Sequence, residues 1–481
     1  MELKDLITHK RRQDTTLPGR ELAEELASDR SRILYSAPFR RLAKKAQVFS
    51  LESNAAVRNR VIHSLEVSDI GRWIAYEVTK HLISTGQLPA ELQLPIIYAV
   101  ENACFLHDIG NPPFGHFGEE AIRSWFIKNW EECYLKSVGS DSADLARMSE
   151  LVKDFKQFDG NPQGLRIILR LRRDRDKFSL NLTYTTILSL IKYVRSPTEP
   201  SSGDLTKKPG YFESEKEIIL KMKTELGLAE NARYVLAYIM EAADDIAYCI
   251  SDIEDGIEKG VLTTEGFFKE LASEWTNDEW NKDRETDVFP VGEISSHEDE
   301  KVRFFTFKTS YTRNSIARAR DRFLESMAAF LEGTAPGLFS KGSSEDRAFE
   351  CLKRVSRRKL FRSPQAENPE LAGYQIVTGL LDKLRVLLEC PQTQFESLLA
   401  GRKDPSKIAG KGLDYHWRLF NKLPKKNLAA YQDLLQEREL KDFPEWYHRA
   451  HLIVDYVSGM TDGFALEFYQ LLDGIRLAQE W

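Results

Sequence analysis

The chain has 481 residues and a formal net charge of −6 at pH 7, with 42% hydrophobic and 30% charged residues. This balance is typical of a folded protein with a large core, and it excludes both a mostly disordered chain and a chain-wide attraction to nucleic acid or an anionic membrane. The length favours one large domain with additions, or two domains.

The five cysteines are widely spaced and form no CxxC pair, which argues against a disulfide framework or a cysteine zinc site. The N-terminus, MELKDLITHKRRQD, lacks the apolar segment of a signal peptide. The best apolar stretch, LPIIYAVENACFL (94–106), is interrupted by Glu101 and Asn102. We therefore expect a cytoplasmic protein without a membrane span.

Apolar residues recur at helical spacing along most of the chain, first at 62–74 and then at 96–104. Polar stretches at 137–147, 195–214 and 272–300 are typical of loops. The one persuasive strand is KVRFFTF (301–307), which we pair with DVFPVGEI (287–294). We found no βαβ alternation, internal repeat, Walker loop or dinucleotide fingerprint. The sequence predicts a mainly α fold with at most a minor β-hairpin.

The stretch FLHDIGNPPFGHFGEEA (105–121) follows an apolar helix and places His107 and Asp108 together at its end. A buried, ionised aspartate is tolerated when it is paired or binds a metal, and imidazole with carboxylate is a common ligand mixture for divalent ions. His63, on the preceding helix, can supply a third ligand, although a single histidine on an apolar helix is more often a hydrogen-bonded core residue.

The segment YIMEAADDIAYCISDIEDGIEKG (238–260) offers a fourth ligand. Asp244, Tyr248 and Asp252 are spaced at i, i+4 and i+8, and Glu241 precedes them by three, so they share one helical face. A row of acids commonly marks a solvated face. This helix is otherwise apolar, however, and few cations nearby could balance the row, which favours a functional role.

The arrangement of His63, His107-Asp108 and Asp244 resembles the H…HD…D signature of the HD-domain metal-dependent phosphohydrolases. The segments HDIGNPPFGHFGEEAI, MEAADDIAYCISDIEDGI, QVFSLESNAAVRNRVIHSLEV and DYVSGMTDGFA are similar to those of the bacterial deoxyguanosine triphosphate triphosphohydrolases (dGTPases). The resemblance runs from about Ser28 to the C-terminal helix. It implies an HD-domain helical core with additional helical insertions. We expect residues 1–270 to form the catalytic core with an N-terminal substrate-contacting segment, and residues 271–481 to complete the pocket and make oligomer contacts.

The resemblance implies hydrolysis of dGTP, and of other dNTPs, to deoxynucleoside and inorganic triphosphate by attack of water on the α-phosphorus. Matching residue by residue, it assigns the metal ligands to His63, His107, Asp108 and Asp244, and the catalytic pair to His116 and Glu119. Among substrate contacts it assigns the sugar 3′-hydroxyl to Gln47 and Asp252, the deoxyribose to Tyr248, and the phosphates to Arg60, Lys192, Tyr193 and Lys208. Guanine specificity rests on the resemblance alone.

The implied cofactor is one divalent ion. Two imidazoles and two carboxylates suit Mn²⁺, Fe²⁺, Co²⁺ or Zn²⁺ more comfortably than Mg²⁺, but the ligands do not decide among these five metals. Because ligand histidines must be deprotonated, we expect activity to be lost below about pH 6. His116 can either donate a proton to the leaving 5′-oxygen or orient the attacking water.

Two other functions stay open. One is another HD-domain nucleotide phosphohydrolase, although HDIGNPPFGHFGEE has neither the GYP motif nor the ED pair of two such groups. The other is a nucleic-acid-binding regulatory HD protein. It is favoured by the basic runs LRIILRLRRDRDK (165–177) and CLKRVSRRKLFR (351–362), the second with Lys353, Arg354, Arg357 and Arg358 on one helical face. These runs could also bind single-stranded DNA as an effector. By family resemblance we expect a homo-oligomer, such as a hexamer, and a deoxynucleotide activator is known in the wider family.

Overall fold

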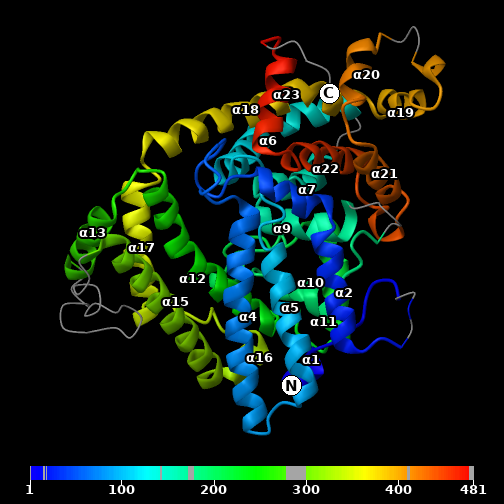
Figure 1. Cartoon of the computed structure of the whole chain (residues 1–481). Coiled ribbons are helices and arrows are strands. Elements are labelled where there is room, and N and C mark those ends of the chain that lie inside the picture. The colour runs from blue at the N-terminus through cyan, green and yellow to red at the C-terminus, as the bar shows by residue number, and fades with distance from the viewer. Residues whose placement is uncertain are drawn as a thin grey trace.

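The computed structural model describes residues 2–14, 17, 19–140, 144–171, 178–277, 299–408 and 412–475. These residues fold almost entirely into helices (Figure 1), so the prediction of a mainly α protein is confirmed. The α-helices are α1 (Leu3–Leu6), α2 (Leu22–Leu34), α3 (Ala37–Arg41), α4 (Arg60–Ser84), α5 (Gln93–Leu106), α6 (Gly115–Val138), α7 (Leu145–Leu151), α8 (Lys153–Lys156), α9 (Gly160–Arg166), α10 (Tyr184–Ser189), α11 (Lys216–Glu225), α12 (Val235–Glu258), α13 (Thr264–Asn277), α15 (Glu300–Glu325), α16 (Met327–Glu332), α17 (Ser344–Lys359), α18 (Pro364–Glu389), α19 (Gln392–Gly401), α20 (Asp414–Phe420), α21 (Lys425–Leu434), α22 (Glu445–Ser458) and α23 (Asp462–Leu472).

Short 3₁₀ turns and one π-helical turn connect several of these helices. The 3₁₀ turns are η1 (Leu42–Lys44), η2 (Ala90–Leu92), η5 (Asp204–Thr206), η6 (Glu213–Glu215), η7 (Pro405–Lys407) and η8 (Arg438–Leu440), and the π turn is η4 (Ile167–Leu171). Within the described ranges, β structure is limited to two isolated bridges, one joining Ala46 to Asn59 and one joining Arg195 to Pro209.

The strand predicted at 301–307 is wrong, because these residues lie in α15. Phe304, Phe307 and Tyr311 are buried at helical spacing, whereas Phe305 between them is 69% exposed. The buried residues therefore recur every three to four positions, as in a helix, and they continue past residue 307, where the predicted strand ended. Its expected partner, 287–294, lies outside the described residues. The loop expected at 272–300 is also wrong at both ends, where α13 and α15 occupy the chain.

The central core packs α4 and α5 side by side, with α12 and α2 against them (Figure 1). The Asn59 side chain caps α4 by accepting hydrogen bonds from two backbone N–H groups of its first turn. Gly71 lets α4 approach α5 closely, because a Cβ there would lie 2.8 Å from Cys104 Sγ. This contact brings His63 on α4 near the C-terminal end of α5, where His107 follows.

A second hydrophobic cluster joins α6 and α8 to the C-terminal helices α18, α22 and α23. Trp125 and Phe126 of α6 pack there, and the Trp125 indole N–H donates to Asp382 of α18 over 2.7 Å. Because α6 starts just after the His107-Asp108 turn, that turn lies where the two clusters meet. The division of the chain at residue 270 stays a prediction.

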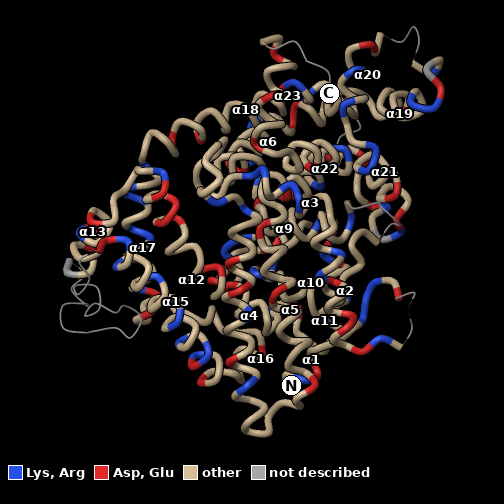
Figure 2. The backbone as a smooth tube through the Cα atoms, viewed as in Figure 1, with Lys and Arg blue, Asp and Glu red and all other residues tan. Residues whose placement is uncertain are grey.

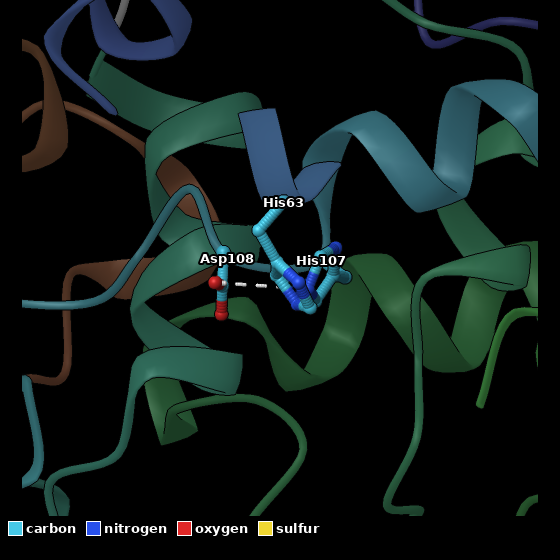
Figure 3. A group of neighbouring side chains, drawn as sticks. All are labelled: His63, His107 and Asp108. Atoms are coloured by element: carbon cyan, nitrogen blue, oxygen red, sulfur yellow. Dashed lines mark ion pairs between the residues drawn. The ribbon is translucent and has the colours of Figure 1, made fainter. Parts of the chain in front are cut away.

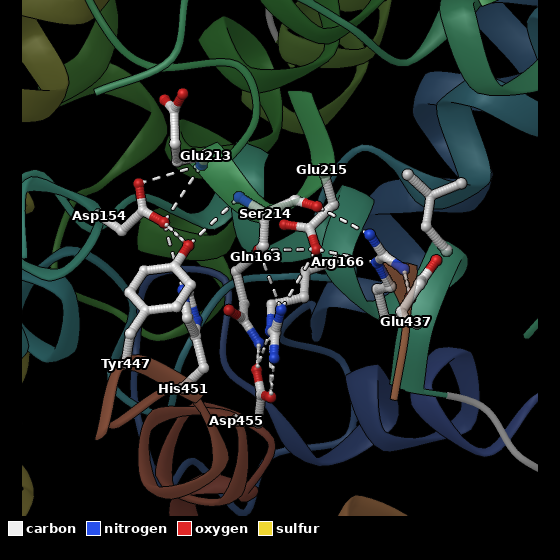
Figure 4. A network of polar contacts seen from close by, with 12 residues as sticks. Asp154, Gln163, Arg166, Glu213, Ser214, Glu215, Glu437, Tyr447, His451 and Asp455 are labelled. Atoms are coloured by element: carbon white, nitrogen blue, oxygen red, sulfur yellow. Dashed lines mark hydrogen bonds and ion pairs between the residues drawn. The ribbon is translucent and has the colours of Figure 1, made fainter. Parts of the chain in front are cut away.

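A buried polar network links α9 and η4 to η6, to Glu437 just before η8, and to α22 (Figure 4). Arg166 lies 2.9 Å from Asp455 and 3.2 Å from Glu215, and Arg170 lies 3.3 Å from Glu215 and also pairs with Glu437. Both arginines are at most 3% exposed. The basic run at 165–177 is therefore no surface patch at these two arginines, which corrects the expected nucleic-acid contact there. Residues 172–177 lie outside the described part.

Nearby, Asp154 accepts hydrogen bonds from Tyr447 at 2.5 Å and, at 3.2 Å, approaches His451 (Figure 4). Burial raises the pKa of the Asp154 carboxyl and lowers the pKa of His451, so neither residue favours its charged form. This part of the interior is held by neutral hydrogen bonds beside the arginine pairs.

Charges of both signs alternate along the peripheral helices α13, α15 and α17 (Figure 2). Arg354 and Arg358 of α17 pair with Glu270 and Glu274 of α13 at 2.6–2.8 Å. In the part of the chain that the structure describes, we find no helix with the length and apolar character needed to span a membrane.

Candidate metal and nucleotide site

The structure brings every predicted site residue to one cavity of about 880 Å³. The cavity lies between α4, the turn after α5, α12 and the start of α6, with α17 and α18 at its other side. The predicted residues among those that line it are Gln47, Arg60, His63, His107, Asp108, His116, Glu119, Lys192, Tyr193, Lys208, Asp244, Tyr248 and Asp252.

His63, His107 and Asp108 point toward one another from α4 and from the turn after α5 (Figure 3). One ligand atom of each lies within 4.8 Å of the others. Asp244 on α12 closes the group, because its Oδ1 lies 3.2 Å from His63 Nε2 and 3.6 Å from His107 Nε2. Two imidazoles and one carboxylate thus lie around one point, and Asp244 adjoins both imidazoles.

Neighbouring groups orient these side chains as a metal site requires. His107 Nδ1 lies 2.7 Å from the Cys104 carbonyl oxygen, which fixes the proton on Nδ1 and leaves Nε2, a buried atom without a hydrogen bond, free to bind an ion. Asp108 accepts from the Arg60 guanidinium at 2.6 Å and from the Asn111 amide at 2.5 Å. The residues present fit one divalent ion.

The two carboxylates of this group stay ionised. Burial raises the pKa of Asp108, but the positive charge of Arg60, with the adjacent imidazoles, outweighs it and holds that pKa at about 2. Burial acts in the same direction on Asp244, and His107 and His63 hold its pKa below the ordinary range. The site therefore presents negative charge to a cation.

His116 and Glu119 lie in the first turn of α6. Glu119 Oε2 lies 3.0 Å from His116 Nδ1, and Glu119 Oε1 accepts from the backbone N–H of Gly160 at 2.8 Å. Glu119 is 4% exposed at its side chain, whereas His116 is 83% exposed. The hydrogen bond that His116 donates to Glu119 raises the pKa of His116. A buried acid thus orients a histidine that faces the open cavity.

Cations line the part of the cavity near His116 and Asp244. Lys208 Nζ lies 2.7 Å from Asp159, and Lys192 Nζ lies 3.5 Å from Glu241 and 4.0 Å from Asp244. Tyr193 is buried beside them. Each lysine is near acids, yet both remain at the cavity wall, where an anionic ligand could compete for them.

Elsewhere on the cavity wall, some polar atoms have no partner among the described residues. Gln47 Oε1 and both carboxyl oxygens of Asp252 are buried without a hydrogen bond among the described residues. Burial raises the pKa of Asp252 to about 8, so this carboxyl is neutral and can donate as well as accept. Tyr248 lies one helical turn from both Asp244 and Asp252 on α12.

The cavity also contains residues that the sequence did not single out for it. Asp159 and Asn161 begin α9, and the FDGNPQG segment gave only the signal of a capped helix start. Lys353 and Arg357 were predicted on one face with Arg354 and Arg358, but the four divide. Lys353 and Arg357 line the cavity, whereas the other two pair with α13.

Comparison with known proteins agrees with this geometry. The model of the HD domain family matches residues 60–248, and that of the phosphohydrolase-associated domain matches 418–471. A deoxyguanosinetriphosphate triphosphohydrolase of Yersinia pseudotuberculosis serotype O:3 (strain YPIII) is 35% identical over 492 residues, covering 94% of each chain. One of Cronobacter sakazakii (strain ATCC BAA-894) is 35% identical over 496 residues, covering 95% of each. The chain belongs to the deoxyguanosinetriphosphate triphosphohydrolase family.

Membership of the dGTPase family confirms the resemblance seen in the sequence. The HD match spans the three segments that supply the histidines and aspartates of the metal group. The dGTPase relative from Yersinia pseudotuberculosis is matched over 94% of its length, and the phosphohydrolase-associated domain match includes α22 and most of α23.

Proposed function

We propose that this protein hydrolyses dGTP to deoxyguanosine and inorganic triphosphate at the cavity between α4, α6 and α12. The convergence of a metal-binding group, an oriented histidine and two lysines on one cavity carries the proposal. The phosphohydrolase family of the chain supports the same reaction class.

His63, His107, Asp108 and Asp244 hold one divalent ion in this proposal. The bound ion supplies neutralisation of phosphate charge and polarisation of the phosphorus–oxygen bond. Arg60 stays in contact with Asp108, so it fixes a ligand and at the same time presents a cation to the α-phosphate. The ion is Mn²⁺, Mg²⁺, Co²⁺, Fe²⁺ or Zn²⁺, and metal analysis of the purified protein identifies it.

His116 serves the proton transfer. Its Nδ1 is held by Glu119, so Nε2 is the nitrogen that faces substrate. With its pKa raised, His116 keeps a proton to higher pH than a free imidazole, and it can give this proton to the leaving 5′-oxygen. Orientation of the attacking water is the second role open to it, and the pH dependence described in the Discussion separates the two.

The remaining residues bind the nucleotide. Lys192, Tyr193 and Lys208 contact the triphosphate. Gln47 and Asp252 contact the sugar 3′-hydroxyl, a group that could satisfy their unpartnered oxygens.

Tyr248 packs against the deoxyribose so that a 2′-hydroxyl would meet steric and desolvation costs, and dGTP is therefore preferred over GTP.

The direct test incubates the purified chain with each of the four dNTPs and with GTP, in Mn²⁺ or Mg²⁺, and identifies the products by chromatography. We expect triphosphate and deoxyguanosine from dGTP and much slower turnover of GTP. An Asp244→Ala variant controls for contaminating phosphatases. Release of pyrophosphate or of single phosphates would instead favour another HD-domain phosphohydrolase.

We also propose that the protein is a cytoplasmic homo-oligomer. All five cysteines are buried and free, which suits a reducing compartment. Light scattering after size-exclusion chromatography measures the molar mass in solution. A single species at the mass of one chain would contradict the proposed oligomer.

Single-stranded DNA is a candidate effector through Lys353 and Arg357. Both line the cavity, and the Arg357 side chain is 60% exposed. Fluorescence anisotropy of a labelled oligonucleotide should show binding that weakens with salt and with Arg357→Ala. The regulatory alternative, an HD protein without turnover, would bind DNA and release no triphosphate.

A further inference from the structure

Asp462, the first residue of α23, connects two walls of the cavity that are far apart in the sequence. Its Oδ2 accepts the backbone N–H of Ala46 at 3.0 Å, and its Oδ1 accepts the backbone N–H of Phe114 at 3.1 Å. Ala46 precedes Gln47, and Phe114 lies two residues before His116. One carboxylate, 3% exposed, therefore holds the Gln47 segment and the His116 turn in a fixed relation.

Lys45 makes a parallel connection between the same segments. Its ammonium, buried to 4% exposure, donates to the Asn111 carbonyl at 2.5 Å and to the Ser458 carbonyl at 2.9 Å. The Lys45 carbonyl also accepts the backbone N–H of Arg60 at 3.1 Å. The segments 45–47, 111–114 and 458–462 thus form one hydrogen-bonded junction behind the cavity.

The part of the junction next to His116 is strained. Phe114 has a φ of 61°, a left-handed conformation that costs a non-glycine residue free energy unless its surroundings enforce it. Its ring packs against Gly373 of α18, where a Cβ would come within 2.3 Å of it. The hydrogen bond to Asp462 holds the Phe114 N–H before α6 begins, and the Phe114 carbonyl accepts the N–H of Gly118 in the first turn of that helix.

We propose that Asp462 is a positioning residue which sets the distance between Gln47 and His116. Recognition of the sugar 3′-hydroxyl then depends on a side chain from the C-terminal helix α23. The inference rests on the proposed function, because it assumes that Gln47 contacts that hydroxyl and that His116 serves the reaction.

Asparagine at position 462 keeps the size of the side chain but breaks the junction. A carboxylate offers two acceptor oxygens, whereas an amide offers one acceptor and one donor, so one backbone N–H would face an N–H group. The substitution should leave the N-terminal cap of α23 intact, because the cap is the Thr461 side chain, which accepts the N–H of Phe464. Loss of one of the two bonds frees either the Gln47 segment or the Phe114 turn.

The experiment measures kcat and KM of the full-length, metal-loaded enzyme for dGTP and for 2′,3′-dideoxyguanosine triphosphate. The wild type should prefer dGTP. Asp462→Asn and Asp462→Ala should lower the preference for dGTP, measured as kcat/KM for dGTP divided by kcat/KM for the dideoxynucleotide. The expected decrease is about tenfold, the factor that corresponds to one lost hydrogen bond. Lys45→Met, which removes the parallel connection, provides a second variant and should lower the ratio in the same direction.

Thr461→Ala is the matched control, because it weakens the start of the same helix without touching either segment. It should lower Tm and leave the ratio unchanged. The inference is overturned if Asp462→Asn and Lys45→Met keep the wild-type ratio, or if the wild type does not distinguish the two nucleotides while still releasing triphosphate. Failure of the proposed function would show earlier, as a wild type that releases no triphosphate from dGTP.

Discussion

His107 and His116 are each oriented by one hydrogen bond, but their surroundings differ. The His107 side chain is 8% exposed and its ring meets His63 at a centroid distance of 5.2 Å, whereas His116 is 83% exposed. A buried imidazole beside two carboxylates suits a cation, and an exposed imidazole on a buried acid suits exchange of protons with a ligand. The difference in burial therefore indicates different roles for two histidines that are only nine residues apart in the sequence.

Substitution of the His116 pair should alter catalysis without removing the metal. His116→Ala should lower kcat roughly 10²- to 10⁴-fold and leave the metal content unchanged, because the residue lies outside the ligand group. Kinetics and metal analysis of the same preparation test this. Loss of the metal together with activity would contradict the separation of roles.

Glu119→Gln tests whether His116 donates a proton. The Glu119 hydrogen bond raises the pKa of His116, so its removal lowers that pKa, and the protonated form is then lost at a lower pH. If His116 is the acid, the alkaline limb of the pH profile of kcat should move to lower pH. Glu120→Gln, on the same helix but 53% exposed at its side chain, should leave the limb in place. An unmoved limb in Glu119→Gln favours the water-orienting role.

Asp252 should make the stability of the metal-free protein depend on pH. Its folded-state pKa is about 8, against about 4 in the unfolded chain, so unfolding releases a proton between these values and the free energy of unfolding falls as pH rises. The contribution is at most about 1.4 kcal/mol per pH unit. Asp252→Asn should remove it, whereas Asp69→Asn on the exposed face of α4 should not. Urea unfolding in EDTA from pH 5 to 8 measures both, and equal slopes for wild type and Asp252→Asn would contradict the assignment.

At the scale of elements, local patterns predicted the helices well where each pattern lay within one segment. The apolar residues of 62–74 and the acidic row of 241–252 both lie on helices, and the HD turn lies between helices as expected. The apolar residues of 62–74 do not form one buried face, however, because Ile62, Leu65 and Trp73 are exposed. The exception is 301–307. These seven residues include Val302 and three phenylalanines, and their apolar positions fit both the two-residue period of a strand and the 3.6-residue period of a helix. The buried positions of α15 as far as Phe323 distinguish them.

The part of the site that escaped prediction depends on contacts between distant segments. Asp462 contacts Ala46 across 416 positions, and Lys45 contacts Ser458 across 413. No spacing rule for a helix or a turn connects such residues. The sequence could therefore identify the DYVSGMTDGFA segment by its resemblance to a family, but it could not show that Asp462 contacts Ala46 and Phe114.

Gly110 shows how closely two elements approach near the site. A Cβ on Gly110 would lie 2.1 Å from the Gly160 carbonyl and from the Gly164 N–H nitrogen, so Gly110→Ala must push α9 away. That shift breaks the bond from Gly160 to Glu119. We expect a lower Tm and a lower kcat, because Glu119 then loses the contact that holds it beside His116. Gly463→Ala, on α23 with open space around it, should change stability by at most about 1 kcal/mol in the favourable direction. Full activity of Gly110→Ala would show that the turn tolerates the displacement.

For the whole molecule, the proposed metal ligands lie on α4, at the end of α5 and on α12, which form the central core. An ion that binds only the folded state should therefore stabilise the entire chain. At a free concentration of 100 times Kd the gain is about 2.7 kcal/mol. We expect Mn²⁺ to raise Tm and EDTA to reverse the rise.

Asp244→Ala should abolish this metal-dependent increment, whereas Asp245→Asn, the neighbour that faces Lys353, should retain it. Thermal unfolding with and without metal distinguishes them. The ligand assignment would be wrong if Asp244→Ala kept the full increment.

The arginine network around Arg166 has a consequence for how the chain can be shortened. A fragment that ended at residue 417 would contain the whole HD match but would lack Glu437 and Asp455. Arg166 and Arg170 would then share Glu215 alone in the interior, an uncompensated charge of the kind that costs several kcal/mol. The start of the phosphohydrolase-associated match is therefore not a boundary of folding, and we expect a chain that ends just before it not to fold.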